Sequence, residues 1–497
     1  MALTQADLAT PLTNGIDPYN LGKYQFLLDD IQGNILKSHG RDHSAHLFLQ
    51  FKVKADLIKS WIRDFAKQYV TSAQRQAEDS KAYKEAKQRG EQAPESPLFA
   101  NFFLSMQGYL QLGFEYGQTP NDKFFRAGAK DPQTWAALGD PPPRNPIFSF
   151  IRNWDSGFAD RIDALVLLAH DNPEILQQQV NQVRQSLRRV AKVLRQEAGF
   201  ILRNEAGYPI EHFGFRDGLS QPLFMKDDID RVRSGSNFDQ WDPRSPLNLV
   251  LVKDPHGKTE DSYGSYLVYR KLEQNVQGFR QRIRQMASAL KISVELAEAY
   301  TIGRFRDGTP VTLASEPDAN QITNEFNYAS DMQGSRCPFH AHIRKSNPRG
   351  DSGRIKPPDI PLEEEKSHRI VRRGISYGDK TPQADPQKGS GLLFMCFQAD
   401  IEHQFLFIQV LWVNGVNFVK PQVGKDPLAG QGAAFPNGKN QHLWPKQWGD
   451  EEAGFEDFNF NYDTDKKPEP PSISQWVNMK GGENFFAPSI SFLKDLE

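Results

Sequence analysis

The first half of the chain switches between strand-like and helix-like spacing of its apolar residues. Between residues 45 and 53 every second residue is apolar, which predicts a strand with one buried face. From Asp56 to Tyr69 apolar residues recur every three or four positions, which predicts an amphipathic helix. Residues 71–97 are polar and charged, and we expect an exposed helix or an insertion there.

The same spacing predicts two further strands and a second helix. The strands are expected at 102–112 and 162–168, and the helix begins at Pro173 and runs to Leu194. A short strand at 200–203 closes the unit. The resulting order β-α-β-β-α-β is the ferredoxin-like arrangement, in which each crossover helix covers one face of an antiparallel sheet.

The second half of the chain is less regular. Its expected elements are a strand at 265–269, helices at 276–290 and 294–300, a strand at 392–397 and a helix at 401–411. Residues 303–389 and 412–482 are rich in loop-forming residues, and stretches of this kind are usually functional. We place the boundary between two units, 1–209 and 210–497, and expect an α+β protein whose second sheet carries a large irregular insertion.

Composition narrows the class of protein. The chain has 497 residues, which predicts two to three domains, and 60 basic against 62 acidic residues give a net charge of -2. A nucleic-acid-binding protein would usually show a basic excess, so we expect none here. The two cysteines, Cys337 and Cys396, are too few for a disulfide framework or a four-cysteine zinc site. They also do not form the C-x-x-C-H pattern that attaches haem through thioether bonds.

The N-terminal residues carry no secretion signal pattern. A basic segment followed by an apolar one is missing from Met1 to Asn20. No apolar run approaches the length of about 18 residues that a membrane helix needs. We therefore predict no membrane association and a cytoplasmic location.

One carboxylate lies between two glycines in the run Gly214-Phe215-Arg216-Asp217-Gly218. Glycines allow positive φ and close approach of the backbone, so a flat ligand could lie against this turn. The carboxylate of Asp217 could accept a proton and return it. A structural aspartate in a surface turn would give the same pattern.

Two histidines, His340 and His342, alternate with Phe339, Ala341 and Ile343. On an extended stretch both imidazoles would point to the same side. Neutral imidazole is the commonest metal ligand in proteins, although a hydrogen-bonded structural histidine remains an alternative. Two histidines could also bind zinc, but a third ligand at a convincing spacing is missing.

Other residues could contribute charge or redox chemistry. Arg372 and Arg373 stay charged at any working pH and could stabilise negative charge on a bound oxygen species, or form a surface salt-bridge cluster. His170 ends an apolar strand, where we favour a loop-capping role over a cleft residue. Trp412 and Tyr377 could carry electrons to the surface, although aromatic residues are more often core packing.

Taken together, these runs resemble the dye-decolourising peroxidase family, in particular its larger bacterial members. The segment Asp30–Leu36 looks like the N-terminal signature of that family, and Gly214–Gly218 fits its GxxDG motif. Ser265–Leu272 is similar to a recurrent strand, His342 falls at the proximal haem ligand, and Arg372 falls at the distal arginine. The resemblance covers most of the chain, and several motifs in one order make it specific.

The resemblance implies two ferredoxin-like domains of the dimeric α+β barrel superfamily, with non-covalent haem b between them. His342 would bind the iron, Asp426 would hydrogen-bond His342, and Asp217 and Arg372 would act on the opposite side. The residues Gly214, Phe215 and Gly218 would lie against the cofactor, and Trp412 and Tyr377 would relay electrons. His340 would be at most a group beside the ligand.

The implied reaction is reduction of hydrogen peroxide through a ferryl haem, with dyes, phenols or other one-electron donors as reductants. Aspartate titrates at about 3.9, about 2.6 units below histidine, so an acidic optimum is expected. Two other classes stay open: a haem-binding or haem-handling protein with incidental peroxidase activity, and a non-haem metal protein that uses His340 and His342. The sequence leaves open whether the chain forms a homo-oligomer.

Overall fold

The computed structural model describes residues 2–91, 95–143, 154–355, 360–380, 389–421, 423–431 and 476–497. Parts of three predicted segments lie outside these ranges: residues 92–94 of the polar stretch 71–97, and two short pieces of the irregular stretch 303–389. Residues 422 and 432–475 of the loop-rich stretch 412–482 also lie outside them.

The first half of the chain contains four long strands. Its elements are α1 (Gln5–Ala9), η1 (Gly22–Tyr24), α2 (Gln25–Asp30), β1 (His43–Phe51), α3 (Ala55–Gln68), α4 (Ala73–Gln88), β2 (Phe99–Ser105), α5 (Met106–Gln111), η2 (Tyr116–Gln118), α6 (Lys123–Ala127), α7 (Pro132–Leu138), β3 (Ala164–His170), α8 (Pro173–Leu187), β4 (Ala191–Phe200) and β5 (Leu202–Arg203).

The second half repeats four strands within more irregular surroundings. Its elements are β6 (Pro209–Ile210), α9 (Lys226–Arg233), η3 (Leu247–Leu249), β7 (Val252–Lys253), β8 (Tyr263–Gln274), α10 (Val276–Leu290), α11 (Val294–Ile302), η4 (Ala319–Gln321), α12 (His342–Ser346), α13 (Asp351–Ile355), α14 (Leu362–Ser367), β9 (Val371–Arg372), β10 (Ile375–Tyr377), β11 (Gly391–Gln398), the π-helical segments η6 (Glu402–Leu406) and η7 (Ile408–Val413), β12 (Val477–Ala487) and α15 (Ile490–Lys494).

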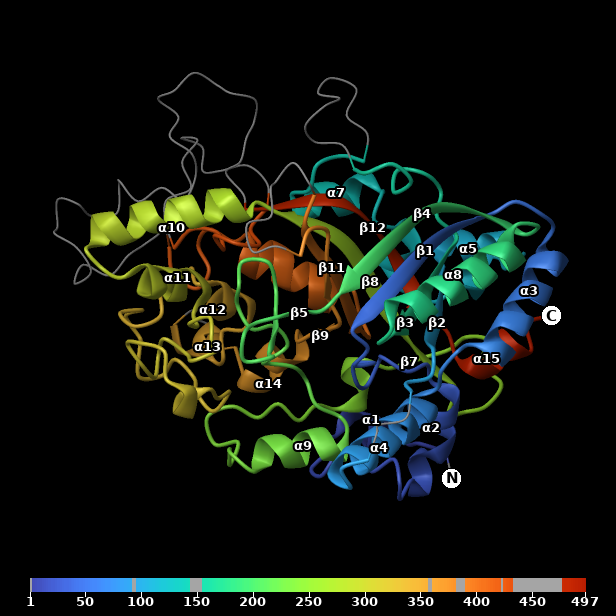
Figure 1. The fold of residues 1–497 in the computed structure, drawn as a ribbon, viewed down its shortest axis with the longest axis horizontal. Helices are drawn as coiled ribbons and strands as arrows, with labels where there is room; N and C mark the ends of the chain where they lie inside the picture. The colour runs from blue at the N-terminus through green and yellow to red at the C-terminus, as the bar shows by residue number, and fades with distance from the viewer. Residues whose placement is uncertain are drawn as a thin grey trace.

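The first four strands form an antiparallel sheet in the order β4-β1-β3-β2. The crossover helices α3 and α8 pack on its outer face, where Figure 1 shows α8 beside β1 and β3 and α3 farther to the right. This is the predicted ferredoxin-like arrangement. The polar stretch from residue 71 supplies α4, which contacts α2 and is therefore not free of partners.

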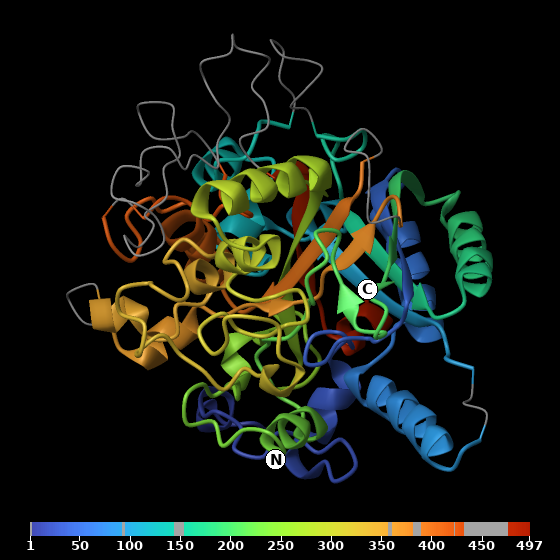
Figure 2. The same cartoon turned by 60° about the vertical axis from the view of Figure 1, so that its left-hand side comes forward.

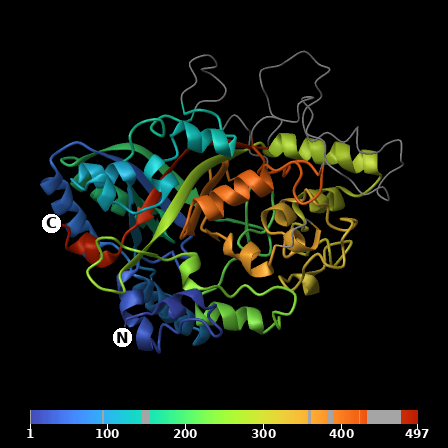
Figure 3. The same ribbon diagram turned by 180° about the vertical axis from the view of Figure 1, so that it is seen from behind.

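The second four strands follow the same order, β12-β8-β11-β10. The helix α10 follows β8, and the π-helical turns η6 and η7 follow β11, as the two crossover helices of a ferredoxin-like unit do. Figure 2 brings α10 and α11 forward, and Figure 3 shows η6 and η7 in orange from behind.

The two sheets close into one barrel. Strand β2 pairs with β12, and β4 pairs with β10 through Phe200 and Ser376. Since β8 also pairs with β11, the ring contains eight strands, with β7 and β9 as two-residue additions to β8 and β11. The fold is therefore the predicted α+β class, and the boundary between 209 and 210 stays a prediction.

Side chains alternate between the inside and the outside of this barrel. Phe48, Leu165 and Tyr269 belong to the inner core, whereas Leu47 and Val166 pack against the outer helices. Both cores hold fully buried aliphatic and aromatic side chains, so burial on both faces stabilises each strand.

The predicted strand 102–112 is wrong beyond Ser105. The Ser105 hydroxyl accepts a hydrogen bond from the Gly108 amide at 3.1 Å and starts helix α5. A side chain at Gly108 would collide with the Asp163 carbonyl oxygen, so the turn requires glycine. The capping serine therefore outweighs the apolar run that follows it.

The predicted helix 173–194 is wrong beyond Leu187. The chain turns there, and residues 191–200 pair with β1 as strand β4. The amide of Lys52 donates to the Val190 carbonyl at 3.1 Å and so fixes the start of this pairing. The apolar spacing fitted a helix only because Val190 and Leu194 happen to continue its period.

The predicted loop 412–482 is wrong from Val477 onward, because β12 begins there. Its residues pair with β8 and β2, and the register shifts between Met479 and Gly481. Two glycines and a lysine interrupt the alternation there, so the sequence did not indicate a strand. In the part of the chain that the structure covers, no helix is long and apolar enough to cross a membrane.

Candidate active site

A cavity of about 300 Å³ opens on the outer face of the second sheet. Arg270 and Leu272 of β8 and Phe394 of β11 form its floor, and residues of α12 and η7 lie on other sides. All described lining residues fall within 211–477. The described lining residues therefore all belong to the second unit. The resemblance implied haem between the two units, and the position of haem stays a prediction.

The loop before Asp217 is shaped by a half-buried carboxylate, that of Glu211. Glu211 accepts hydrogen bonds from the amides of Phe213 at 2.8 Å and Phe215 at 2.9 Å, and from Gln274 at 2.6 Å. Burial raises the pKa of Glu211 above its ordinary 4.5, although these amide donors oppose the rise. Gly214 has φ of 101°, which only glycine adopts without strain.

Asp217 and Arg372 meet at the cavity wall. Asp217 Oδ1 lies 3.6 Å from Arg372 Nη1 and accepts the Gly218 amide at 2.6 Å. Both side chains stay about one-third exposed, at 34% and 35%. A proton acceptor and a permanent cation thus face the same space.

Arg372 is held by the residues that follow Asp217. Its Nη2 donates to the Ser220 carbonyl at 3.0 Å, and its amide donates to Gln221 Oε1 at 3.1 Å. On the other side, β9 pairs Arg372 with Cys396 of β11. A loop and a strand that are distant in sequence therefore hold Arg372 above the cavity.

His342 also lines this cavity, as the first residue of α12. Its Nδ1 lies 2.7 Å from Asp426 Oδ2, while Asp426 Oδ1 accepts the amides of Leu428 at 2.8 Å and Ala429 at 3.0 Å. The chain is not an extended stretch here, because residue 342 begins a helix. His340 is fully buried and is not among the lining residues.

His342 and Asp426 each stabilise the charged form of the other. Burial disfavours the imidazolium, but the Asp426 carboxylate outweighs it, and the pKa of His342 is raised above 6.5. Burial would likewise raise the pKa of Asp426, but His342 and two backbone amides keep it lowered. A neutral His342 that donates from Nδ1 has Nε2 left for a ligand.

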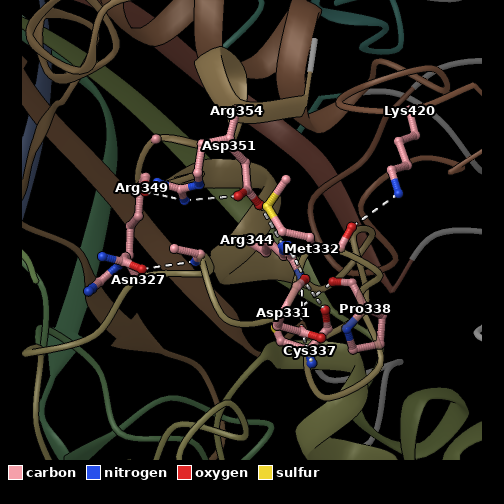
Figure 4. A network of polar contacts seen from close by, with 12 residues as sticks. Asn327, Asp331, Met332, Cys337, Pro338, Arg344, Arg349, Asp351, Arg354 and Lys420 are labelled. Carbon is pink, nitrogen blue, oxygen red and sulfur yellow. Dashed lines mark hydrogen bonds and ion pairs between the residues drawn. The ribbon is translucent and has the colours of Figure 1, made fainter.

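Two buried cations anchor the short helix α12. Arg344 bonds Asp331 at 3.1 Å and Asp351 at 2.8 Å, as Figure 4 shows. Lys345 donates to the carbonyl oxygens of Phe418 at 3.0 Å and Gly424 at 2.7 Å, within the segment that leads to Asp426. Together they fix His342 relative to its partner.

Further arginines give the cavity a positive wall. Arg304 and Arg349 are buried, line the cavity, and donate to carbonyl and amide oxygens around Asn324. Burial lowers the pKa of Arg304 to about 9 and that of Arg349 to about 10. Among the described residues no carboxylate lies within ion-pair distance of either one. Buried positive charges without carboxylate partners favour a ligand that carries anionic groups.

Comparison with known proteins identifies this arrangement. Residues 30–201 match the DyP dimeric alpha+beta barrel domain, and residues 235–418 match the Dyp-type peroxidase C-terminal domain. The multifunctional dye peroxidase DyP2 of Amycolatopsis sp. is 38% identical over 96% of this chain and 97% of its own. The chain belongs to the dye-decolourising peroxidase family.

Other comparisons place it within that family. The solved DyP-type peroxidase of Anabaena sp. is 50% identical, with a TM-score of 0.88 and full coverage of both chains. A deferrochelatase of Yersinia pestis is 30% identical, but over only 43% of this chain and 39% of its own. The chain is thus a peroxidase of the dye-decolourising type.

Several predicted residues of this peroxidase lie away from the cavity wall. Phe215 and Gly218 line it, but Gly214 and Asp426 stand behind it. Trp412 and Tyr377 are each only 4% exposed, so neither is a surface residue. Trp412 stacks on Phe418 with ring centres 5.4 Å apart. Their relay role stays a prediction.

Two further expectations concern histidines. His170 is buried at the end of β3, and its Nδ1 accepts the Asn172 amide at 2.9 Å, which agrees with the favoured capping role. Within the described ranges no group of three His, Cys, Asp or Glu side chains could hold a metal ion. The geometry therefore offers no support for a non-haem site at His340 and His342.

Sequence reasoning missed Glu211, Arg304 and Arg349. The chain has 60 basic residues, and no local pattern separates these two arginines from exposed ones in the same irregular stretch. Glu211 lies outside the glycine-flanked motif that drew attention to Asp217. Only the folded chain reveals the three residues, through the burial of the two arginines and through the hydrogen bonds that Glu211 accepts from two backbone amides.

Proposed function

We propose that this peroxidase binds haem b in the cavity and uses it to reduce hydrogen peroxide with dyes, phenols or other one-electron donors. The observation that carries the proposal is one cavity lined by His342, Asp217 and Arg372, with Asp426 bonded to the histidine. Bound haem would supply the iron that exchanges electrons with peroxide and with the donors.

The residues fit this cofactor at two places. His342 Nε2 would coordinate the iron, while the bond from Nδ1 to Asp426 sets the tautomer and makes the imidazole more electron-rich. Arg304 and Arg349 would pair with the carboxylates of the porphyrin, because they are buried cations without carboxylate partners among the described residues.

Asp217 and Arg372 would carry the proton and charge chemistry. Asp217 would accept the first proton of peroxide and deliver it to the departing oxygen. Arg372 would stabilise the negative charge that develops as the oxygen–oxygen bond breaks. Gly374 has no side chain, so position 374 gives no side-chain contact to peroxide.

The experiment is a hemin titration of the purified protein followed by peroxide. We expect an intense Soret band on hemin addition and a rapid spectral change with peroxide. Asp217→Asn and Arg372→Leu should keep the band and lose the rapid change, whereas His342→Ala should weaken haem binding. A protein that stays colourless with hemin would contradict the proposal.

The alternative is a haem-handling protein with incidental peroxidase activity, which the shorter match to the deferrochelatase favours. A carrier needs neither Asp217 nor Arg372, so the two variants separate the alternatives. The acidic optimum, the cytoplasmic location and any homo-oligomer stay predictions.

A further inference from the structure

The segment Gln32–Leu36 has no part in the proposed chemistry, although the sequence singles it out. It belongs to the first unit, and no described residue of that unit lines the cavity. Its backbone nevertheless bonds to Arg373, the residue next to Arg372.

The segment is held rigidly on its own side. Gln32 Nε2 donates to the carbonyl oxygens of Phe102 at 2.7 Å and Pro488 at 2.9 Å, and its Oε1 accepts the Phe102 amide at 2.9 Å. The Asn34 amide donates to Gln76 Oε1 at 2.8 Å, and Asn34 has a left-handed φ of 71°. This backbone therefore has one conformation, fixed by partners on β2 and α4.

The fixed backbone presents two consecutive carbonyl groups to one guanidinium. Arg373 Nε donates to the Asn34 oxygen at 2.6 Å, and Nη2 donates to the Ile35 oxygen at 3.0 Å. The remaining nitrogen, Nη1, donates to the carbonyl oxygen of Arg372 at 2.9 Å. A planar fork of donors matches this arrangement, whereas a single ammonium could not make all three bonds.

Apart from the contacts of Arg372 with Ser220 and Gln221, few backbone bonds hold strand β9. It contains only Val371 and Arg372, paired with Phe397 and Cys396. One further backbone bond, from the Arg373 amide to the Met395 oxygen at 2.7 Å, extends the contact with β11. The direction in which Arg372 leaves the strand therefore depends on the bonds around Arg373.

We propose that Arg373 is a positioning residue, which uses the rigid Asn34–Ile35 backbone of the first unit to hold Arg372 over the cavity. This inference rests on the proposed function, in which Arg372 acts on peroxide. A displacement of about 1 Å at a catalytic group can cost about 100-fold in rate, so the anchor matters without touching substrate.

The test compares Arg373→Met and Arg373→Lys with the matched control Arg126→Met. Arg126 also donates to backbone carbonyls, those of Thr119 at 2.9 Å and Pro120 at 3.1 Å, but it lies away from the cavity. In the haem-loaded protein we expect Arg373→Met to lower the rate constant with peroxide about 10- to 100-fold. Cyanide affinity of the ferric form should fall as well, while haem content and the KM for the donor stay unchanged, and Arg373→Lys should recover part of the loss.

A second variant approaches the anchor from the opposite side. A side chain at Gly33 would lie 2.6 Å from Gln76 Oε1 and 2.8 Å from the Phe99 ring, so Gly33→Ala shifts the segment without changing Arg373. We expect the same loss of peroxide reactivity. The double variant should lose no more than Arg373→Met alone, since both act through one contact.

Hydrogen exchange on the haem-free protein separates this inference from the proposed function. Amides of residues 370–375 should exchange faster in Arg373→Met than in Arg126→Met. Equal exchange, or equal peroxide rate constants for these two variants, would overturn the positioning role. If the unmodified protein does not bind hemin, the proposed function is contradicted. The hydrogen-exchange result would still decide whether Arg373 holds Arg372 in place.

Discussion

Replacing Asp426 with asparagine tests the link between His342 and the cofactor most directly. Asp426 Oδ1 accepts two backbone amides, and Oδ2 takes the hydrogen of His342 Nδ1. An asparagine that keeps its oxygen on the two amides must turn its NH2 group toward Nδ1. The imidazole would then have to accept at Nδ1 and carry its hydrogen on Nε2, which is the nitrogen that iron requires.

The expected magnitude follows from this conflict. If His342 keeps the tautomer that leaves Nε2 free for iron, the variant loses the hydrogen bond between Nδ1 and a charged carboxylate. A hydrogen bond to a charged group contributes about 1.5–3 kcal/mol. Every 1.4 kcal/mol is about tenfold in affinity, so haem should bind about 10- to 100-fold more weakly. The loss should be large because Asp426 is only 2% exposed and water cannot replace the carboxylate.

The assay is a hemin titration followed by transfer of haem to an acceptor protein, with Asp254→Asn as control. Asp254 is also a buried carboxylate that accepts two backbone amides, those of His256 at 3.0 Å and Ser489 at 2.7 Å, and it does not line the cavity. Its replacement should lower stability and leave haem affinity unchanged. Equal haem affinity in the two variants would refute the tautomer argument and the assignment of His342 as ligand.

Four further outcomes follow. Lys345→Met should lower the melting temperature and weaken haem binding, since buried carbonyls such as that of Gly424 lose a donor at about 1–3 kcal/mol each. Gly214→Ala should slow the peroxide reaction, because an alanine at φ of 101° is strained by about 1–2 kcal/mol; unchanged kinetics would separate this loop from catalysis. In the haem-free protein, the raised pKa of His342 adds stability below pH 6.5 that is lost as pH rises through that pKa, and thermal scans of Asp426→Asn should lack this slope. Trp412→Phe should lower turnover of bulky dyes at full haem content if Trp412 relays electrons, and unchanged turnover would exclude that role.

The fold could be predicted where local pattern and tertiary partners agree. The helix from Asp56 and the strand before it appear as expected, because burial on one face selected their spacing. The errors at Ser105 and Leu187 arise where a helix and a strand adjoin directly or through a turn of only three residues, 188–190. There, an apolar run continues across the junction, and only the capping bond or the partner strand marks the change.

The site divides in the same way. Asp217 could be found because glycines flank it, and Arg372 and His342 because several runs resembled one family in order. Asp426 follows His342 by 84 residues, and its contact depends on how the intervening chain folds. Arg304 and Arg349 could not be separated from solvated arginines, because a buried cation differs from an exposed one only in its surroundings.

The second sheet separates packing from chemistry by the alternation of its side chains. On β8, Tyr269 belongs to the barrel core, while Arg270 and Leu272 line the cavity. A strand has a side-chain period of two, so a shift of one residue would exchange these faces. Closure of the barrel through β2–β12 and β4–β10 fixes that register, and the first unit thereby determines which residues meet the proposed cofactor. The contact of Arg373 with the Asn34–Ile35 backbone is a second, more local way in which the cavity depends on the first unit. That unit contributes no described lining residue, yet it determines the geometry of the cavity.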